Sequence, residues 1–494
     1  MRAGRSEGVL RFSVAILSHK RPHLLPRVLW AISQLDYPLF EIVVVGDLPS
    51  IHDFGLPSHL ADQVKYVEYV EPNICRSRNL AVELSSGDVV AFCDDDAVPE
   101  PDWLSQLARA FAFPDVGAVG GLVRGMDGLT VEWAGGVFDR TASERAMVMQ
   151  DKFRVFDAES QVIGNEFVGT MGANSAFLRE AVQSIGGFDE AYRYYLDETD
   201  LMLRLAEAGW DCGIVLDAEV HHLREENSAR DTLRTPRNLF EIAASKAYFC
   251  RRHVKEGSIP QLLAAFRANR ERELDPYIRL GLLRSADRQR LLDQVDEGVQ
   301  AGLSRAHKLP KRSTATGPMF KKFRPVLEDR LSVAIMAGWG MDALRSRRLS
   351  RRLADAGHSV SCISYLSGFH APRVGYAGGV WLHSGGTWRW PTWVDGVPTI
   401  GRTARGTVEL NRVGVHRRFD LLLGRVPAKV SCRAKVRLPG FARSIEASLL
   451  VGSPAKLQSA VARLAASMDD SLNMGPQEQA SPNVGSGVAE AAAG

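Results

Sequence analysis

Short apolar runs alternate with segments of helical periodicity along the first hundred residues, and this alternation restricts the possible folds of the chain. The runs at Phe12–Leu17, Glu41–Gly46 and Val89–Cys93 have the length and composition of strands buried on both faces. Segments with apolar residues at helical spacing, 24–35 and 76–84, lie between them. Because strands that alternate with helices form βαβ units, the sequence predicts an α/β domain with a mixed, mostly parallel sheet flanked by helices.

The chain of 494 residues is too long for one ordinary domain. A charged helical pattern follows the first α/β pattern, and a basic segment containing Pro, Gly, Ser and Thr then precedes a second α/β pattern that starts at LSVAIM. The predicted organisation is a first domain at 1–235, a helical extension at 236–307, a linker at 308–328, a second small Rossmann-like region at 329–473 and a disordered tail at 474–494.

The composition is that of a soluble globular protein, with 45% apolar and 24% charged residues. No segment approaches the roughly 18 apolar residues that cross a bilayer, and the N-terminal apolar run lacks a small-residue cleavage site. The six cysteines form no CxxC pair, which argues against a zinc site and a disulfide framework. A net charge of +3 does not indicate nucleic acid as a partner. We therefore expect a cytoplasmic protein, with peripheral contact to the inner face of the membrane as an option.

Three consecutive aspartates, Asp94, Asp95 and Asp96, follow the apolar run that ends at Cys93. Adjacent carboxylates repel one another unless a positive group joins them, and open α/β sheets bind ligands at the carboxyl ends of their strands. A divalent cation is the obvious positive group. The alternative is a solvated acidic turn between a strand and a helix that starts near Pro101.

The order of several motifs resembles that of the family 2 glycosyltransferases of the GT-A fold, over roughly residues 10–225. The motifs are the strand followed by SHKRP, EIVVVGD, NICRSRNLA, GDVVAFCDDDAVPEPDWL, GANSAFLR, GGFDE and DETDLMLRLAEAGW. The resemblance implies a nucleotide-diphosphate-sugar donor, a divalent metal bound through a DxD-type motif, and inverting transfer of a sugar to an acceptor hydroxyl. Mg²⁺ or Mn²⁺ suits this chemistry because a few carboxylates hold it while substrate phosphates complete its shell.

The resemblance also implies roles for the acidic residues and for a histidine that follows a later strand. Asp96 corresponds to the direct metal ligand, Asp94 lies nearer the ribose and base, and Asp95 is intermediate. His221 corresponds to the histidine that completes the metal site in some relatives, although two adjacent histidines, His221 and His222, are also compatible with an ordinary surface loop.

A second acidic cluster begins at Asp197, where the family usually has Glu-Asp-x-Asp and this chain has Asp-Glu-Thr-Asp. The resemblance maps the general base that deprotonates the acceptor hydroxyl to Glu198, with Asp197 as the second candidate. The alternative is stabilisation of a helix start, because acids in the first turn favour the helix without any catalysis. That alternative is sufficient for Asp200.

Further candidates for donor binding are Ser18, Arg21, Asp47 and Arg78. Family members commonly carry two aspartates after the second strand, whereas this chain reads Gly46–Asp47, so Asp47 is expected to take over the contact with the nucleobase. Arg78 belongs to the Arg-Asn pair that the family carries before a helix. An ordinary N-terminal helical turn is the other interpretation of that pair.

The second α/β region resembles the start of a GT-B glycosyltransferase, with a strand, a glycine turn, a helix and Gly-His-x-Val, but the double glycine of the first turn is absent. A remnant, an acceptor-side module and a docking domain are the interpretations that remain open. Its first helix carries five arginines, which form either a solvated face or a surface for anionic lipid or polysaccharide. They are Arg345, Arg347, Arg348, Arg351 and Arg352.

Together these patterns predict a metal-dependent inverting glycosyltransferase that extends a cell-surface glycan or related glycoconjugate. The alternative is a non-catalytic glycan-binding or scaffold protein derived from such an enzyme. The survival of both acidic clusters favours the enzyme, since a scaffold has no chemical reason to keep them. A phosphotransferase is disfavoured because the chain lacks a P-loop motif.

Overall fold

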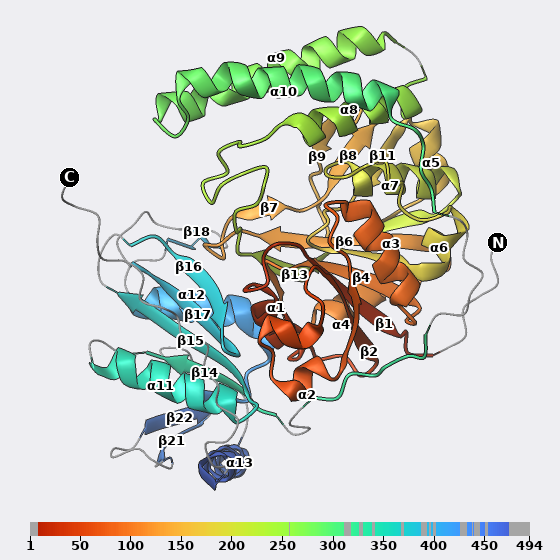
Figure 1. Ribbon diagram of the computed structural model, residues 1–494. Helices are drawn as coiled ribbons and strands as arrows, with labels where there is room; N and C mark the ends of the chain where they lie inside the picture. Colours follow the sequence, from red (N-terminus) through yellow and green to blue (C-terminus); the bar gives the residue numbers. More distant parts are fainter. Residues whose placement is uncertain are drawn as a thin grey trace.

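The computed structural model (Figure 1) has an N-terminal α/β domain, a helical arm and a C-terminal α/β region. The predicted tail at 474–494 and part of the predicted linker, 311–317 and 326–328, lie outside the described residues. The structure describes residues 8–255, 257–310, 318–325, 330–337, 341–366, 370–386, 393–394, 397–398, 402–424, 432–436, 438, 445–449 and 453–473.

The N-terminal domain is built on a large mixed sheet of order β10-β13-β6-β12-β4-β1-β2-β3, with β5 paired to β13 and β7 to β6. Strands β4, β1, β2 and β3 are parallel, as are β6 and β13, whereas β12 runs antiparallel between β4 and β6. The strands are β1 Phe12–Ser18, β2 Phe40–Gly46, β3 Val64–Glu68, β4 Val89–Asp94, β5 Ala97–Pro99, β6 Val116–Arg124, β7 Val131–Trp133, β10 Phe153–Phe156, β12 Ser175–Leu178 and β13 Asp211–His222.

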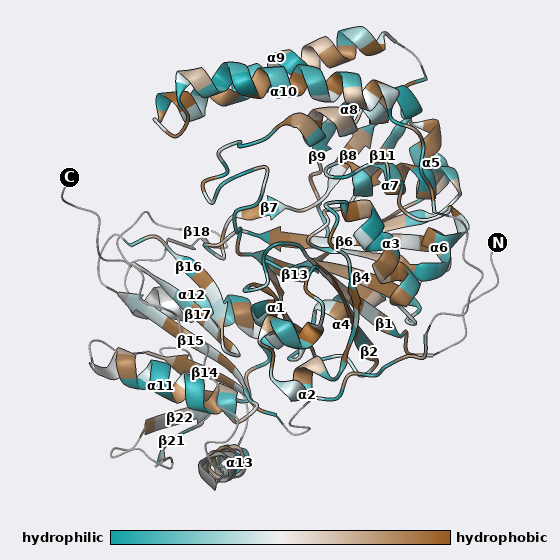
Figure 2. Ribbon diagram, viewed as in Figure 1, coloured by the Kyte–Doolittle hydropathy of each residue, from teal (hydrophilic) through white to brown (hydrophobic). Residues whose placement is uncertain are grey.

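The central strands of this sheet, such as β1, β2 and β4, are apolar on both faces because helices cover them, and they appear as the brown centre of the domain in Figure 2. The covering helices and short turns are α1 Leu25–Ile32, η1 Ile51–Phe54, α2 Ser58–Ala61, α3 Ile74–Leu84, α4 Trp103–Ala110, α5 Ala158–Ile163, α6 Arg179–Ser184 and α7 Asp197–Glu207. A small sheet of order β11-β8-β9 lies beside them, from Glu166–Gly169, Gly136–Asp139 and Glu144–Ala146. The predicted fold class, a GT-A Rossmann-like α/β sheet flanked by helices, is confirmed.

The predicted helical extension consists of α8 Phe240–His253, α9 Ile259–Arg279 and α10 Ser285–Ser304, of which α9 and α10 form the arm at the top of Figure 1. Helix α10 packs closely on α8 because Gly298 and Gly302 have no side chain. A Cβ atom at either position would overlap the carbonyl oxygen of Phe240 or Ala244. Helix α8 in turn packs on the N-terminal domain, and its residues Tyr248 and Phe249 are part of that domain's core. The extension is therefore joined to the first domain by a continuous apolar contact.

The C-terminal region contains a sheet of order β16-β17-β15-β14-β20-β22-β21, in which the four central strands β17, β15, β14 and β20 are parallel. This parallel core between helices matches the predicted Rossmann-like pattern. Its elements are β14 Ser332–Met336, α11 Met341–Asp355, β15 Ser359–Leu366, β16 Arg373–Ala377, β17 Val380–Gly386, β18 Trp393–Val394, β19 Val397–Pro398, α12 Arg402–Arg417, β20 Leu421–Leu423, β21 Cys432–Val436, β22 Ile445–Leu449 and α13 Pro454–Asn473.

The segment at 318–325 runs along the edge of the first domain. Phe323 donates its backbone N–H to the carbonyl of Phe40 at 2.7 Å, and the two rings stack with centroids 5.1 Å apart. Arg330 donates to the carbonyls of Gln34 and Leu35 beyond the end of α1. This part of the predicted linker is thus tied to the domain that it leaves.

The two α/β regions also meet through buried charges. Arg417 at the end of α12 donates two hydrogen bonds of 2.8 Å to the carboxylate of Glu100. Arg412, one turn earlier, donates to Glu219 of β13 at 3.0 Å. Glu100, Glu219 and Arg417 are all almost completely buried, so the contact excludes water.

Candidate active site

The predicted donor site lies at the carboxyl ends of the neighbouring parallel strands β1 and β4. Ser18 is the last residue of β1, Asp94 is the last residue of β4, and Asp95 and Asp96 form the turn that leads into β5. The register pairs Leu17 with Asp94, which places the three aspartates beside the segment after β1. The structure therefore brings the predicted residues of these two motifs together.

Asp95 points into the protein and positions the segment after β1. Its carboxylate accepts hydrogen bonds from the Ser18 hydroxyl at 3.0 Å and from the Arg21 guanidinium at 2.5 Å. Burial raises the pKa of Asp95 to about 7, against the opposing charge of Arg21. Arg21 also donates to Asp96 at 3.1 Å, so one guanidinium holds two of the three aspartates.

His222, the last residue of β13, lies beside Asp96, with 3.3 Å between its Nε2 and Asp96 Oδ1. Its other ring nitrogen, Nδ1, contacts Glu132 at 3.1 Å. Ligand atoms of Asp94, Asp96 and His222 all lie within 4.8 Å of one another. A carboxylate that holds the far nitrogen of a histidine is the arrangement that orients metal-binding imidazoles.

The predicted metal ligand His221 lies in a different cluster. Its Nε2 contacts Glu100 at 3.0 Å and Glu219 at 3.3 Å, and its ring packs edge-on against Trp381 of the C-terminal region. Successive side chains of a strand point to opposite faces of the sheet, so the neighbours His221 and His222 have different surroundings. His222, and not the predicted His221, is therefore the histidine that lies beside Asp96.

Charge interactions within this cluster favour the ionised forms of Asp96 and His222. Burial by itself would raise the pKa of Asp96, but the hydrogen bond and charge of His222 and the charge of Arg21 hold it well below its ordinary value. Burial opposes protonation of His222, yet Asp96 and Glu132 raise its pKa to about 10. Burial and the charge of Asp96 raise the pKa of Asp94. A divalent cation would have to displace the proton of His222, and two carboxylates with one neutral imidazole are then a set suited to Mn²⁺ or Mg²⁺.

The second acidic cluster opens helix α7, and a buried arginine holds it. Arg78 of α3 lies with its Nε 2.9 Å from Asp197 and donates from Nη2 to Glu198 at 3.0 Å. The Arg78 guanidinium also lies over the rings of Phe92 and Phe188. Its charge acts on Asp94 as well, so it connects the two acidic groups electrostatically. Arg78, predicted to contact the donor, is bound here by the candidate bases.

Glu198 remains at the edge of the site, with its side chain 18% exposed, whereas Asp197 is buried. Burial and the neighbouring charge of Asp197 raise the pKa of Glu198 well above its ordinary value. Tyr195 and Leu196, the two residues before the helix, both have left-handed backbone conformations with φ of 72° and 65°. Strain of this kind is tolerated where the surroundings fix a functional geometry.

Gly172 packs directly against this acid pair. A Cβ atom at this position would overlap the Glu198 carboxylate and the Arg78 guanidinium. The glycine thus leaves the space in which these two side chains meet. Nothing in the sequence motif GTMGAN indicates this contact, because it depends on the path of the loop before β12.

Asp200 has a structural role in helix α7, in line with the interpretation that the acids at this position stabilise the helix. It is fully buried and binds Arg204 at 2.7 Å one turn along α7. It also contacts Nε2 of His253 at 2.7 Å, at the end of α8. Asp200 therefore joins the helical extension to the helix that carries Glu198.

Asp47 lies at the end of β2 with one carboxylate oxygen, Oδ2, accepting from the Lys20 amide at 2.6 Å. The other oxygen, Oδ1, is buried and has no hydrogen-bond partner among the described residues. At Gly46, a Cβ atom would lie 2.8 Å from the Phe54 ring and 3.0 Å from the Tyr66 hydroxyl. The crowding explains why this chain has glycine where relatives commonly have a first aspartate.

Sequence reasoning missed three residues of this site: Glu132, Gly172 and Glu225. The Glu225 amide donates to Asp96 at 3.0 Å, and Glu132 holds His222. Glu132 lies in the short strand β7 and Glu225 in the irregular segment after β13, and each reaches this cluster through a tertiary contact without a local signal. His222 was visible only as the neighbour of His221.

The fold is a helix-flanked α/β sheet of the GT-A type, with an acidic cluster at the carboxyl ends of its parallel strands. Residues 13–186 match the family model for glycosyl transferase family 2. This match covers the part of the chain that carries the N-terminal motifs, and it confirms their resemblance to that family.

Several characterised proteins share this part of the sequence. The chain is 32% identical over 141 residues to the glucosyl-dolichyl phosphate glucuronosyltransferase of Haloferax volcanii, which is 28% of this chain and 40% of that protein. It is 30% identical over 128 residues to the succinoglycan biosynthesis protein ExoM of Rhizobium meliloti, which is 24% of this chain and 41% of that protein. The matches therefore span less than half of each relative.

Two solved structures are similar at lower identity. The mannosyltransferase PcManGT from Pyrobaculum calidifontis, in complex with GDP-Man and Mn²⁺, is 16% identical with a TM-score of 0.35, covering 61% of this chain and 89% of that one. TarS 1–349 of S. aureus, in complex with UDP-GlcNAc, is 13% identical with a TM-score of 0.39, covering 59% and 81%. None of the described helices is long and apolar enough to cross a membrane.

Proposed function

We propose that this protein is a metal-dependent inverting glycosyltransferase that moves a sugar from a nucleotide-diphosphate-sugar donor to a hydroxyl of a glycan or glycoconjugate acceptor. The observation that carries the proposal is the pairing of two acidic groups across Arg78. One group, with Asp94 and Asp96, has the composition of a metal site, and the other offers Glu198 as a base. A scaffold protein would gain nothing from burying both.

Asp94, Asp96 and His222 would hold the metal, in place of the predicted set with His221. A bound Mn²⁺ or Mg²⁺ would neutralise the charge that develops on the diphosphate leaving group. Asp94 is only partly buried, so this side of the cluster stays open to a ligand. Glu132 fixes the His222 ring so that Nε2 faces the aspartates.

The donor would be oriented by residues at the ends of β1 and β2. The unpartnered Oδ1 of Asp47 is suited to accept an N–H of a nucleobase, since a buried carboxylate oxygen without a partner is costly. Arg21 lies between Asp95 and Asp96, where its guanidinium is near the expected diphosphate. Ser18 and Asp95 hold this segment in place through their hydrogen bond.

Glu198 would take the proton of the acceptor hydroxyl. Its pKa is raised by burial and by Asp197, which brings a carboxylate closer to the basicity that general-base catalysis at neutral pH requires. Arg78 keeps the pair together and opposes this rise through its charge. Asp197 is more deeply buried and is bound by Arg78, so it would act by positioning Glu198.

The names of two relatives refer to a glucosyl-dolichyl phosphate and to succinoglycan biosynthesis, which supports cell-surface glycan synthesis as the setting. We place this synthesis at the cytoplasmic side of a membrane as part of the proposal. The functional unit would extend beyond the predicted boundary at residue 235, because Asp200 of α7 binds His253 of α8. We keep 329–473 as the proposed second region, with an acceptor-side role.

The test is binding and hydrolysis of a panel of nucleotide sugars by the full chain, with Mn²⁺, with Mg²⁺ and with a chelator. Asp96→Asn and Glu198→Gln are the test variants, and Glu159→Gln, an exposed acid on α5, is the matched control. We expect metal-dependent donor binding that Asp96→Asn abolishes. Glu198→Gln should keep donor binding and lose turnover.

The outcomes separate the enzyme from the alternative. If the wild type binds no donor with either metal, the transferase proposal fails and the glycan-binding scaffold becomes the better interpretation. If Glu198→Gln turns over the donor as fast as Glu159→Gln does, Glu198 is not the base.

A further inference from the structure

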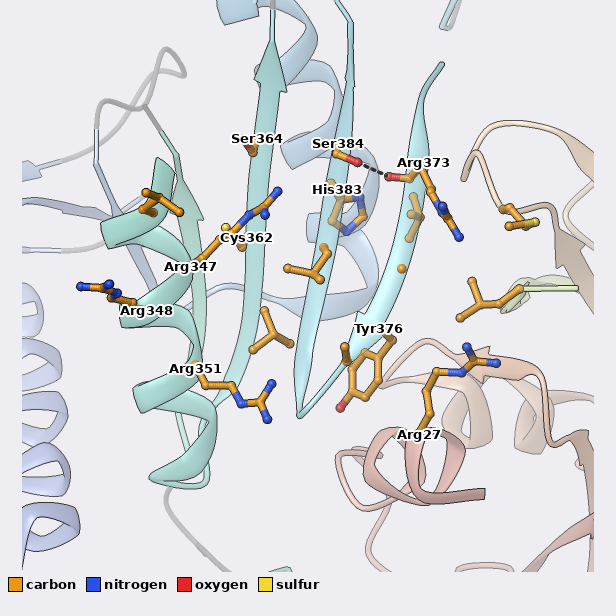
Figure 3. Close-up of a pocket in the computed structure, with 18 of the residues that line it drawn as sticks. Arg27, Arg347, Arg348, Arg351, Cys362, Ser364, Arg373, Tyr376, His383 and Ser384 are labelled. Atoms are coloured by element: carbon orange, nitrogen blue, oxygen red, sulfur yellow. Dashed lines mark hydrogen bonds between the residues drawn. The ribbon is translucent and has the colours of Figure 1, made fainter. Parts of the chain in front are cut away.

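A cavity of about 650 Å³ lies between the N-terminal domain and the C-terminal sheet, and arginines line it (Figure 3). Arg27 comes from α1, Arg347 and Arg351 from α11, and Arg373 from β16. Arg348 of α11 also lines the cavity but points away from the strands in Figure 3, so four of the five guanidinium groups are left, and they come from three separate elements. In Figure 3, Arg347 and Arg351 extend from the helix toward the strands, and Arg27 lies beyond strand β16 on the N-terminal domain.

The positive charge of this cavity is poorly balanced by the residues around it. The lining contains one acid, Glu225, which binds Arg27 at 3.0 Å. Within the described part of the chain, Arg347 and Arg373 form no ion pair, and Arg351 reaches only Asp355 at 3.9 Å. Two nitrogens of Arg27, Nε and Nη2, are buried without a described hydrogen-bond partner. Several positive charges held together in a concave site repel one another, and a bound anion of comparable negative charge would stabilise them.

The cavity also adjoins the donor site. Leu223 and Glu225 line the cavity, and their backbone N–H groups donate to Asp96, at 2.8 Å to its carbonyl and 3.0 Å to its carboxylate. A ligand in the cavity would therefore lie next to the segment that carries the proposed metal ligands. Apolar side chains such as Val374, Tyr376 and Leu382 form another part of the wall, which is suited to the body of a larger molecule.

We propose that this cavity binds the phosphate or diphosphate group of a phosphorylated glycan acceptor through Arg27, Arg347, Arg351 and Arg373. This rests on the proposed function, because it assigns the acceptor side of the same transfer. A guanidinium group can donate two parallel N–H hydrogen bonds to the oxygens of a phosphate. A cluster of several guanidinium groups matches the multiple negative charges of a diphosphate better than the single charge of a carboxylate. A flat membrane surface is disfavoured as the partner because the arginines line opposite walls of a concave site.

The test measures binding of inorganic pyrophosphate to the full chain by calorimetry, in the presence of a chelator so that the donor site holds no metal. The double variant Arg347→Gln/Arg351→Gln removes two of the four charges. Arg279→Gln is the control, since Arg279 is an exposed arginine of the α9 arm, far from the cavity (Figure 1). Donor binding with Mn²⁺ is measured on the same proteins.

We expect the double variant to bind pyrophosphate at least tenfold more weakly than wild type, the control to match wild type, and donor binding to be the same in all three. No pyrophosphate binding by wild type, or an equal loss in Arg279→Gln, would overturn the proposal. Equally tight binding of glucuronate would overturn the preference for phosphate.

Two further results would distinguish the anion site from a membrane surface and from the proposed function. Binding to phosphatidylglycerol vesicles that the double variant loses, and that pyrophosphate does not displace, would replace this proposal with a membrane surface. If the wild type binds pyrophosphate but no nucleotide-sugar donor, the proposed function is overturned, whereas the anion site itself is supported.

Discussion

Replacing Arg417 tests whether the two α/β regions depend on each other for stability. Arg417 and Glu100 are both completely buried, and they share two hydrogen bonds of 2.8 Å. The guanidinium carbon also lies 3.9 Å from the centre of the Trp381 ring. Arg417→Met keeps much of the aliphatic stem against Trp381 but leaves Glu100 as a buried carboxylate with His221 as its neighbour.

The magnitude follows from the asymmetry of buried ion pairs. Removing one partner from such a pair costs about 3–5 kcal/mol, whereas replacing both is often close to neutral. At roughly 2–4 °C per kcal/mol for a region of this size, Arg417→Met should lower the melting temperature by about 6–20 °C. The double variant Glu100→Gln/Arg417→Met should recover much of that loss, because no buried charge is left without a partner.

The assay is calorimetric unfolding of the full chain, with Arg279→Met as a control for loss of an exposed arginine. A change of under about 1 kcal/mol in Arg417→Met would contradict the reasoning, since it would mean that the contact is open to water. So would a double variant that is destabilised by more than Arg417→Met alone.

Three further outcomes are expected. Glu132→Gln should weaken Mn²⁺ binding about 10–100-fold by releasing the His222 ring, measured by metal titration, and unchanged affinity would remove His222 from the proposed ligand set. Gly172→Ala should lower turnover by displacing Glu198 while donor binding stays within about twofold, and wild-type turnover would show that the loop adjusts. Burial would raise the pKa of Asp200, but Arg204 and His253 hold it well below the ordinary value, so its contribution to stability is present at neutral pH and is lost as the pH falls below about 4. Asp200→Asn should therefore flatten the acid side of the stability profile, and an unchanged slope would contradict this assignment.

The sequence predicted most of the parallel strands of both sheets because each is a buried apolar run, as in β1, β2 and β4. It did not predict the short strands β7 to β11, which have three or four residues each and little apolar periodicity. The three aspartates were predicted as a site because a charged turn after a buried strand is a local pattern. His222, Glu132 and Glu225 were not, because their positions around Asp96 depend on the register of β13, on the short strand β7 and on the irregular segment after β13.

Strand β13 relates the two halves of the molecule through the alternation of its side chains. His222 faces the aspartates, while His221 and Glu219 face Arg417 and Arg412 of the C-terminal region. A displacement of helix α12 would therefore act on the same stretch of backbone that positions His222. Since Leu223 continues from this strand into the wall of the arginine-lined cavity, an anion bound there would contact the same segment. On this arrangement the C-terminal region would be a structural part of the proposed transferase site, and its removal should weaken metal binding at Asp94, Asp96 and His222 even though it supplies none of these three residues.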